Sequence, residues 1–230
     1  MENTTEYIRQ ELKNMQDLKY RDFNAKLIPT VDIEKMIGVR VPEIKKLAKK
    51  IYKTESHKFF LEDLPHKYYD EDLLHIQIIN LLNSYDETIY YIEKILPYID
   101  NWAVCDALAP KILKKYPEDF YKKIVTYLSS ERTYTVRFGI VSLMSNYLDE
   151  NYKREQLEIV SDIKSSEYYV NMAIAWYVSH ALIKQYNDAI ELIKSGKMDK
   201  FVHNKSIQKA LESLRIDQKT KNYIKTLKKK

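Results

Sequence analysis

The sequence predicts an all-α fold, and three observations support this prediction. Apolar residues recur at intervals of three and four along almost the whole chain, which is the period of amphipathic helices. The 230 residues include only 3 glycines and 6 prolines, so the tight turns of antiparallel sheets lack their usual residues. Hydrophobic residues make up 45% of the chain and charged residues 31%, which is typical of a globular protein with a sizeable core. An all-β fold is therefore nearly excluded.

The helices can be placed in order along the chain. The first is predicted over residues 6–18, and Asp32 is expected to cap a short turn that ends at Gly38. Pro42 suits the first turn of the next helix, because an N–H at that position has no helical partner. Further helices are predicted over residues 70–82, 86–96, 102–115, 118–128, 133–148, 153–163, 166–185, 187–193, 204–214 and 217–228. Pro110 is expected to end or kink the helix that contains it.

Two segments of the chain resemble each other at a regular interval. Residues 129–131 (SSE) lead to 136–140 (VRFGI), and residues 165–167 (SSE) lead to 170–174 (VNMAI). A fainter copy follows at residues 204–207. Such spacing is typical of helix pairs that stack because no single pair covers its own apolar face. The sequence lacks the tetratricopeptide and ankyrin signatures, so we expect a HEAT-like solenoid with a concave basic groove.

The composition excludes several classes of protein. Gly38, Gly139 and Gly196 are too far apart to build the glycine-rich phosphate loops of Rossmann or P-loop enzymes. Cys105 is the only cysteine and the five histidines have no partner at metal-ligand spacing, so neither a metal nor another cofactor is predicted. No secretory signal, membrane span or linker-like tract is recognisable. We therefore expect one domain over residues 1–230 in a cytoplasmic protein.

The net charge of +5 is unevenly distributed. Lys and Arg greatly outnumber Asp and Glu between residues 40 and 58 and again beyond residue 193, whereas residues 62–100 are mainly acidic. Basic clusters of this kind indicate a polyanionic partner. The alternative for any single Lys-rich run is a solvated helix face without a partner.

Four residues are candidates for a functional site because their side chains are unusual among the apolar and lysine-rich residues of the predicted helices. Trp102 and Asp106 lie four positions apart, so one helical face should present an indole beside a carboxylate. Trp176 lies on a later helix, and Arg137 lies between the two tryptophans in the sequence, among apolar residues. The structural alternatives are core positions for the tryptophans, interaction of Asp106 with its own helix dipole, and an internal ion pair for Arg137.

Together these residues resemble the AlkD-type, HEAT-like DNA alkylation repair glycosylases. Trp102, Asp106, Arg137 and Trp176 match the catalytic cleft positions of that family. The resemblance covers most of the chain and is carried by residues 38–48, 102–106, 136–137, 173–176 and 205–211.

The sequence also departs from the family at three places. Asn101 stands where well-known active members have a second tryptophan, and Asn171-Met172 replaces a Gln-Lys pair. Residues 26–30 lack the tyrosine that those members present to DNA. These differences indicate a related branch, and they concern the range of substrates more than the chemistry.

The resemblance implies a monofunctional glycosylase that hydrolyses the N-glycosidic bond of N3- and N7-alkylated purines in double-stranded DNA, without full base flipping. The Lys- and Tyr-rich, Gly-poor composition is similar to that of proteins from AT-rich bacterial genomes, and we expect a bacterial, monomeric protein. The resemblance also implies that Asp106 assists hydrolysis, that Trp102 and Trp176 contact the cationic lesion, and that Arg137 holds a phosphate. Expected phosphate contacts are Arg40, Lys45, Lys46, Lys49, Lys205, Lys209 and Arg215. Two alternatives stay open: a weak or inactive HEAT-like protein that binds distorted or branched DNA, and a protein–protein scaffold.

Overall fold

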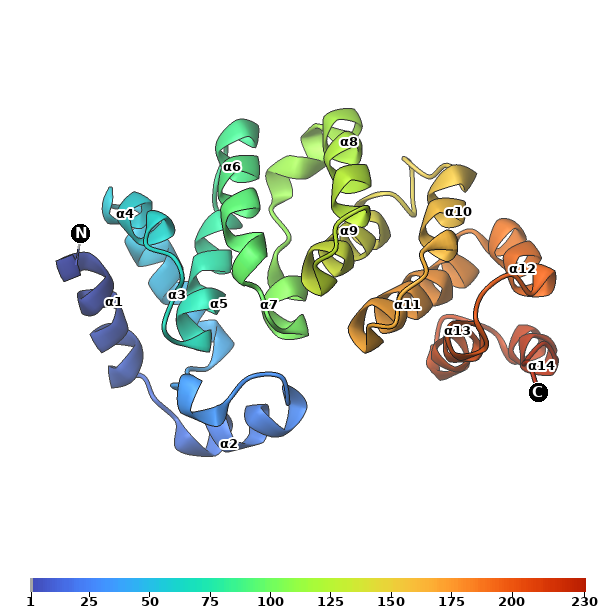
Figure 1. The fold of residues 1–230 in the computed structure, drawn as a ribbon, viewed down its shortest axis with the longest axis horizontal. Coiled ribbons are helices and arrows are strands. Elements are labelled where there is room, and N and C mark those ends of the chain that lie inside the picture. The colour runs from blue at the N-terminus through green and yellow to red at the C-terminus, as the bar shows by residue number, and fades with distance from the viewer. Residues whose placement is uncertain (1) are drawn as a thin grey trace. The chain divides into compact units, whose positions relative to one another are not determined.

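The structure, a computed structural model, describes residues 2–230 and contains fourteen α-helices, three 3-10 helices and, within that range, no strand (Figure 1). It confirms the predicted all-α class and is consistent with HEAT-like repeats. The chain divides into two compact units, Met1–Tyr116 and Pro117–Lys230, which are described separately below. The single domain over residues 1–230 stays a prediction.

The first unit is built around the helix α5. This helix packs against α3 and α7 and also contacts α1, α4 and α6, and most of its residues are buried. The elements of this unit are α1 (Glu2–Asn14), α2 (Leu18–Leu27), η1 (Ile33–Lys35), α3 (Val41–Tyr52), α4 (Ser56–Glu62), α5 (Tyr69–Ile79), α6 (Tyr85–Ile95), η2 (Leu96–Tyr98), α7 (Trp102–Ala107) and η3 (Lys111–Lys115).

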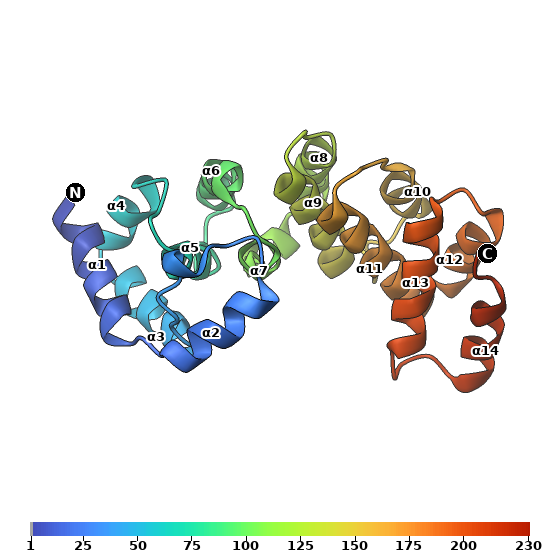
Figure 2. The same ribbon diagram turned by 60° about the horizontal axis from the view of Figure 1, so that its bottom comes forward.

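The second unit consists of helix pairs. In it α9, α11 and α13 pack one against the next, while α8 packs on α9, and both α10 and α12 pack on α11 (Figures 1 and 2). The similar segments 129–131 and 165–167 lie directly before α9 and α11, as expected for equivalent turns. The helices of this unit are α8 (Pro117–Leu128), α9 (Thr133–Asn146), α10 (Arg154–Asp162), α11 (Tyr168–Lys184), α12 (Tyr186–Ser195), α13 (Lys200–Glu212) and α14 (Gln218–Thr226).

Two short helices of the first unit are absent from the sequence prediction. The first predicted helix ended at residue 18, but α1 ends at Asn14 because Asp17 begins a new helix by accepting a hydrogen bond from the Tyr20 N–H at 3.0 Å. This helix, α2, has no buried residue and exposes Phe23 and Leu27, so its sequence shows no clear apolar stripe. The other is α4, which is only seven residues long.

A buried carboxylate holds the turn before α3. The Asp70 side chain, at the start of α5, accepts hydrogen bonds from the backbone N–H groups of Ile37 at 2.6 Å, Gly38 at 3.2 Å and Val39 at 2.7 Å. Gly38 has a φ of 90°, and a Cβ there would lie 2.5 Å from the Cβ of Arg21. The turn therefore requires glycine for both its backbone angle and its close packing.

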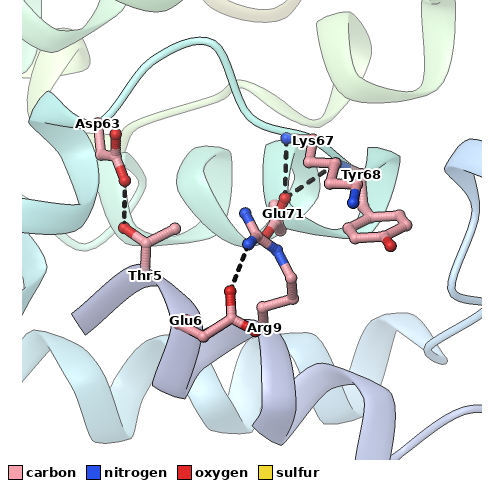
Figure 3. Close-up of polar contacts among 7 residues, drawn as sticks. All are labelled: Thr5, Glu6, Arg9, Asp63, Lys67, Tyr68 and Glu71. Carbon is pink, nitrogen blue, oxygen red and sulfur yellow. Dashed lines mark hydrogen bonds and ion pairs between the residues drawn. The ribbon is translucent and has the colours of Figure 1, made fainter. Parts of the chain in front are cut away.

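A second buried carboxylate attaches α1 to α5 (Figure 3). Glu71 accepts hydrogen bonds from the backbone N–H groups of Lys67 and Tyr68, both at 2.9 Å, and its carboxylate pairs with Arg9 of α1 at 2.8 Å. The Glu71 side chain is fully buried and that of Arg9 is 19% exposed. Because the partners are largely removed from water, loss of either one leaves a charge that solvent cannot compensate.

Replacing Arg9 with methionine is therefore expected to lower the free energy of unfolding by about 3 kcal/mol. Lys46→Met provides the control, because Lys46 pairs with Glu43 at 2.8 Å on the surface, where the Lys46 side chain is 74% exposed. We expect a loss below about 0.5 kcal/mol for that variant. Urea unfolding followed by circular dichroism measures both, and equal losses would contradict the buried-pair interpretation.

Buried His75 of α5 forms a pair with half-buried His66 in the loop before that helix. His66 Nε2 lies 2.8 Å from His75 Nδ1, and the ring of Phe60 stacks on His66 with 4.5 Å between centroids. The remaining ring nitrogens, His66 Nδ1 and His75 Nε2, are buried and have no hydrogen-bond partner. Burial lowers the pKa of His66 to about 4 and that of His75 well below the usual 6.5. Both rings are therefore neutral in the folded protein near neutral pH.

The pair is expected to make the fold sensitive to acid. Below pH 6.5 the two histidines bind protons in the unfolded chain but stay neutral in the folded chain. The free energy of unfolding is therefore highest above pH 6.5 and falls as the pH drops towards 4. We expect His66 alone to account for about 2–3 kcal/mol between pH 7 and 4.5, measured by urea unfolding at each pH. His66→Leu/His75→Leu, which removes both partners, should flatten this dependence, and an unchanged slope would contradict the assignment.

Candidate functional site

The short helix α7 carries two of the predicted site residues. Trp102 and Asp106 lie one turn apart on it and both are half-buried, so neither the indole nor the carboxylate is enclosed in the core. Asn101, which is 1% exposed, caps this helix by accepting a hydrogen bond from the Val104 N–H at 2.9 Å. The residue that departs from the family pattern is thus a helix cap in this protein.

Helix α7 ends much earlier than the sequence predicted. The expected helix over residues 102–115 stops at Ala107, and Pro110, which has no N–H to donate, separates it from η3. Asn80, which follows α5, takes the place of the missing helical partners: its side chain donates to the Ala107 carbonyl and accepts from the Ala109 N–H, both at 2.8 Å. Both ends of α7 are therefore held by asparagine side chains.

The Trp102 indole also lines a cavity of about 210 Å³ between α2, α3, α5 and α7. Its Nε1–H donates a hydrogen bond to the carbonyl of Leu27, the last residue of α2, at 3.2 Å. Tyr20 lines the same cavity, and the guanidinium of Arg40 lies 5.2 Å from the centre of its ring. Arg40 also pairs with Asp17 at 2.8 Å. A predicted phosphate contact thus lies next to the cavity that Trp102 lines.

The remaining predicted contacts of the first unit lie on the exposed face of α3. Lys45, Lys46 and Lys49 are all exposed, whereas the buried side of this helix consists of apolar residues such as Leu47. Lys46 pairs with Glu43 on the same helix. The face is accessible to a polyanion, as the sequence suggested.

In the second unit, α11 presents one accessible stripe. Its half-buried residues Tyr169, Met172, Trp176, His180 and Lys184 recur at steps of three or four, while most of the helix between them is buried. The imidazole of His180 meets the Trp176 indole edge to face, with 5.8 Å between centroids and 88° between planes. Trp176 therefore keeps part of its ring accessible to solvent, which a role in binding requires.

Basic residues surround the C-terminal half of this stripe. Lys209 of α13 and Arg215, which follows that helix, both act electrostatically on His180, and so does Lys184. The pKa of His180 lies below its usual value, mainly because the ring is partly buried and also because of these three cations. Two predicted phosphate contacts, Lys209 and Arg215, are thus close enough to His180, the histidine next to Trp176, to act on it electrostatically. His180 was not among the predicted site residues, although its spacing of four residues from Trp176 places both on one face of a helix.

Lys205 and Arg137 occupy other parts of the second unit. Lys205 lies one turn before Lys209 on α13, with its Nζ 5.9 Å from the ring centre of Phe201. Arg137 is 6% exposed, and its Nη1 donates a hydrogen bond to the Tyr169 carbonyl at 2.8 Å, which ties α9 to the first turn of α11. Its role as a phosphate contact stays a prediction, as do the roles of Trp102, Asp106 and Trp176.

The described residues contain neither a cluster of metal ligands nor a membrane-spanning helix. Between residues 2 and 230, no three His, Cys, Asp or Glu side chains gather as ligands for an ion. Within the same range, every helix is too short or too polar to span a bilayer.

The comparisons with known proteins agree with the sequence motifs and with the helical architecture. The family model described as DNA alkylation repair enzyme matches residues 8–214, which covers most of both units. A search of curated proteins finds no match. From the extent of the family match, we conclude that the chain belongs to the DNA alkylation repair enzyme family.

Proposed function

We propose that the protein is a monofunctional DNA glycosylase that removes N3- and N7-alkylated purines from double-stranded DNA. The observation that carries this proposal is the pairing of Trp102 and Asp106 on α7, where both side chains reach solvent and both ends of the helix are held by asparagines. Membership of the DNA alkylation repair enzyme family supports a DNA substrate.

The chemistry follows from the charge of the lesion. An N3- or N7-alkylated purine is a cation, so it leaves readily with the electron pair of the C1′–N bond, and positive charge develops on the deoxyribose. The carboxylate of Asp106 would stabilise that charge and orient a water molecule, whose oxygen bonds to C1′ while its proton passes to the carboxylate or to solvent. The products are a free neutral base and an abasic site. No acid is needed to protonate the leaving base, which is why one carboxylate suffices.

The tryptophans would supply selectivity for charged lesions. Indole faces attract cations, and each such contact contributes roughly 0.5 to 2 kcal/mol depending on how dry the site is. Trp102 and Trp176 are both half-buried, so each ring keeps an accessible part on a rigid helix. A normal purine is neutral and gains less from the same contact.

The duplex would be held through its phosphates. Basic side chains on α3, on α13 and after α13 fit this role because they neutralise phosphates without reading sequence. The proposed contacts are Arg40, Lys45, Lys46, Lys49, Lys205, Lys209 and Arg215, with Arg137 as a further phosphate ligand. We propose that the lesion is processed without full extrusion of the base, so that no closed base pocket is needed.

The direct test is release of 3-methyladenine or 7-methylguanine from methylated duplex DNA by the purified protein. We expect release in the absence of any added metal or cofactor, measured by chromatography of the free bases. No release at enzyme concentrations equal to that of the lesion would contradict glycosylase activity.

One observation favours a second candidate, a DNA-binding protein without turnover. Asn101 replaces a tryptophan of well-known active members, and in this protein it is 1% exposed and occupied as a helix cap, so it offers no ring to a lesion. This candidate predicts duplex binding of the same strength with no base release. The release assay separates the two.

A further inference from the structure

His180 differs from the other histidines of the chain in its surroundings. His57, His75 and His203 are buried, and His66 is bonded to His75. His180 is half-buried on the accessible stripe of α11, and its ring is nearly perpendicular to the Trp176 indole, with 5.8 Å between the ring centroids. In the described part of the chain its ring nitrogens take part in no hydrogen bond, so they are available to a ligand.

The charges around His180 are positive. Lys184 lies one turn further along the same helix, α13 packs against α11 and carries Lys209, and Arg215 follows α13. Asp149, which follows α9, pairs with Lys184 at 2.5 Å and so offsets one of these charges. The cations that act on His180 come from α11, from α13 and from the segment after α13. The cluster therefore attracts an anion, and it disfavours a proton on the imidazole until that anion arrives.

We propose that His180, with Lys209 and Arg215, binds a DNA phosphate beside Trp176 and takes up a proton as the phosphate binds. This inference rests on the DNA binding of the proposed function and adds to it a ligand and a linked protonation. A phosphate within hydrogen-bond distance of His180 favours the protonated imidazole, because its negative charge outweighs the repulsion from the neighbouring cations. The protonated ring then donates a charge-assisted hydrogen bond to a phosphate oxygen.

Because protonation of His180 accompanies DNA binding in this proposal, it sets the direction in which duplex affinity depends on pH. If the DNA-bound protein holds one more proton than the free protein, duplex affinity rises as the pH falls through the range between the two pKa values of His180. We expect the affinity at pH 6 to exceed that at pH 8 by about fivefold at constant ionic strength. Lysine and arginine titrate too high to produce this effect.

The experiment measures binding of a fluorescent, undamaged duplex by anisotropy at pH 6, 7 and 8, for the unmodified protein and for His180→Gln. Glutamine keeps a hydrogen-bond donor but has no titration, so the variant should bind with nearly the same affinity at all three values. The circular dichroism spectrum and unfolding midpoint of the variant establish that it folds.

A second measurement observes the proton itself. The imidazole resonances of the full chain are titrated by NMR with and without the duplex, and the pKa of His180 should rise on binding. His203 is the internal control in the same unit, because it is 2% exposed and its Nε2 bonds to the Leu227 carbonyl, so addition of the duplex should leave its resonances in place. Duplex binding with an unchanged His180 pKa, or with the pH dependence intact in His180→Gln, overturns this inference and leaves the proposed function standing. Absence of duplex binding at every pH overturns both.

Discussion

Asp106→Asn is expected to lower the rate of base release by at least tenfold, and about 100-fold is typical when a charge aimed at a transition state is removed. Asparagine keeps the size and shape of the side chain but has no negative charge to stabilise the sugar cation. Because the role is confined to the transition state, duplex affinity should stay within about twofold. Single-turnover release of 7-methylguanine and anisotropy of an undamaged duplex measure the two quantities.

Asp86→Asn is the matched control for this experiment. It makes the same change of net charge in the same unit, on the exposed first turn of α6. If both variants reduce base release equally, the reduction comes from the change in net charge of the protein and not from the position of Asp106. Full activity in Asp106→Asn removes Asp106 from the mechanism, and Trp102 would then have to be considered as a binding residue only.

The features that the sequence predicted well are local ones. The four-residue spacing of Trp102 and Asp106 is enough to place both on one face, because a helical turn sets their relation wherever the helix packs. The similar segments before α9 and α11 likewise mark equivalent turns. The helix class and the repeat pattern follow from such short-range relations, whereas the site roles of Trp102, Asp106, Arg137 and Trp176 rest on the family resemblance and stay predictions.

The features that it missed depend on partners far away in the chain. Nothing near Ala107 reveals that Asn80 ends the helix, and nothing near His180 reveals Arg215. Within the acidic stretch of residues 62–100, nothing in the sequence marks Asp70 and Glu71 as different from their neighbours, yet both are fully buried. They act as acceptors for backbone N–H groups and for Arg9, a role that only tertiary packing can assign.

Duplex affinity is expected to fall by about 1,000-fold when salt is raised from about 50 to about 200 mM. This expectation assumes that about six of the eight proposed basic residues each neutralise a phosphate and release close to one counterion on binding. A protein–protein scaffold would bind its peptide partner with little salt dependence, and a chain whose lysines are merely solvated would bind DNA weakly at both concentrations. The plot of log affinity against log salt, taken from anisotropy at fixed pH, distinguishes these cases.

The location of the contacts can be tested with two variants of equal charge. Lys205→Gln/Lys209→Gln/Arg215→Gln should reduce the slope of that plot by about three, because each of these side chains would neutralise one phosphate. The control triple replaces three exposed lysines near α8, α10 and α12, namely Lys122, Lys153 and Lys197. Its slope should be unchanged, because those helices pack on α9 and α11 and carry none of the proposed phosphate contacts. Equal slopes for both triples would mean that DNA responds to the net charge of the unit and not to the basic face of α13, and the assignment of Lys209 and Arg215 as phosphate ligands would fail.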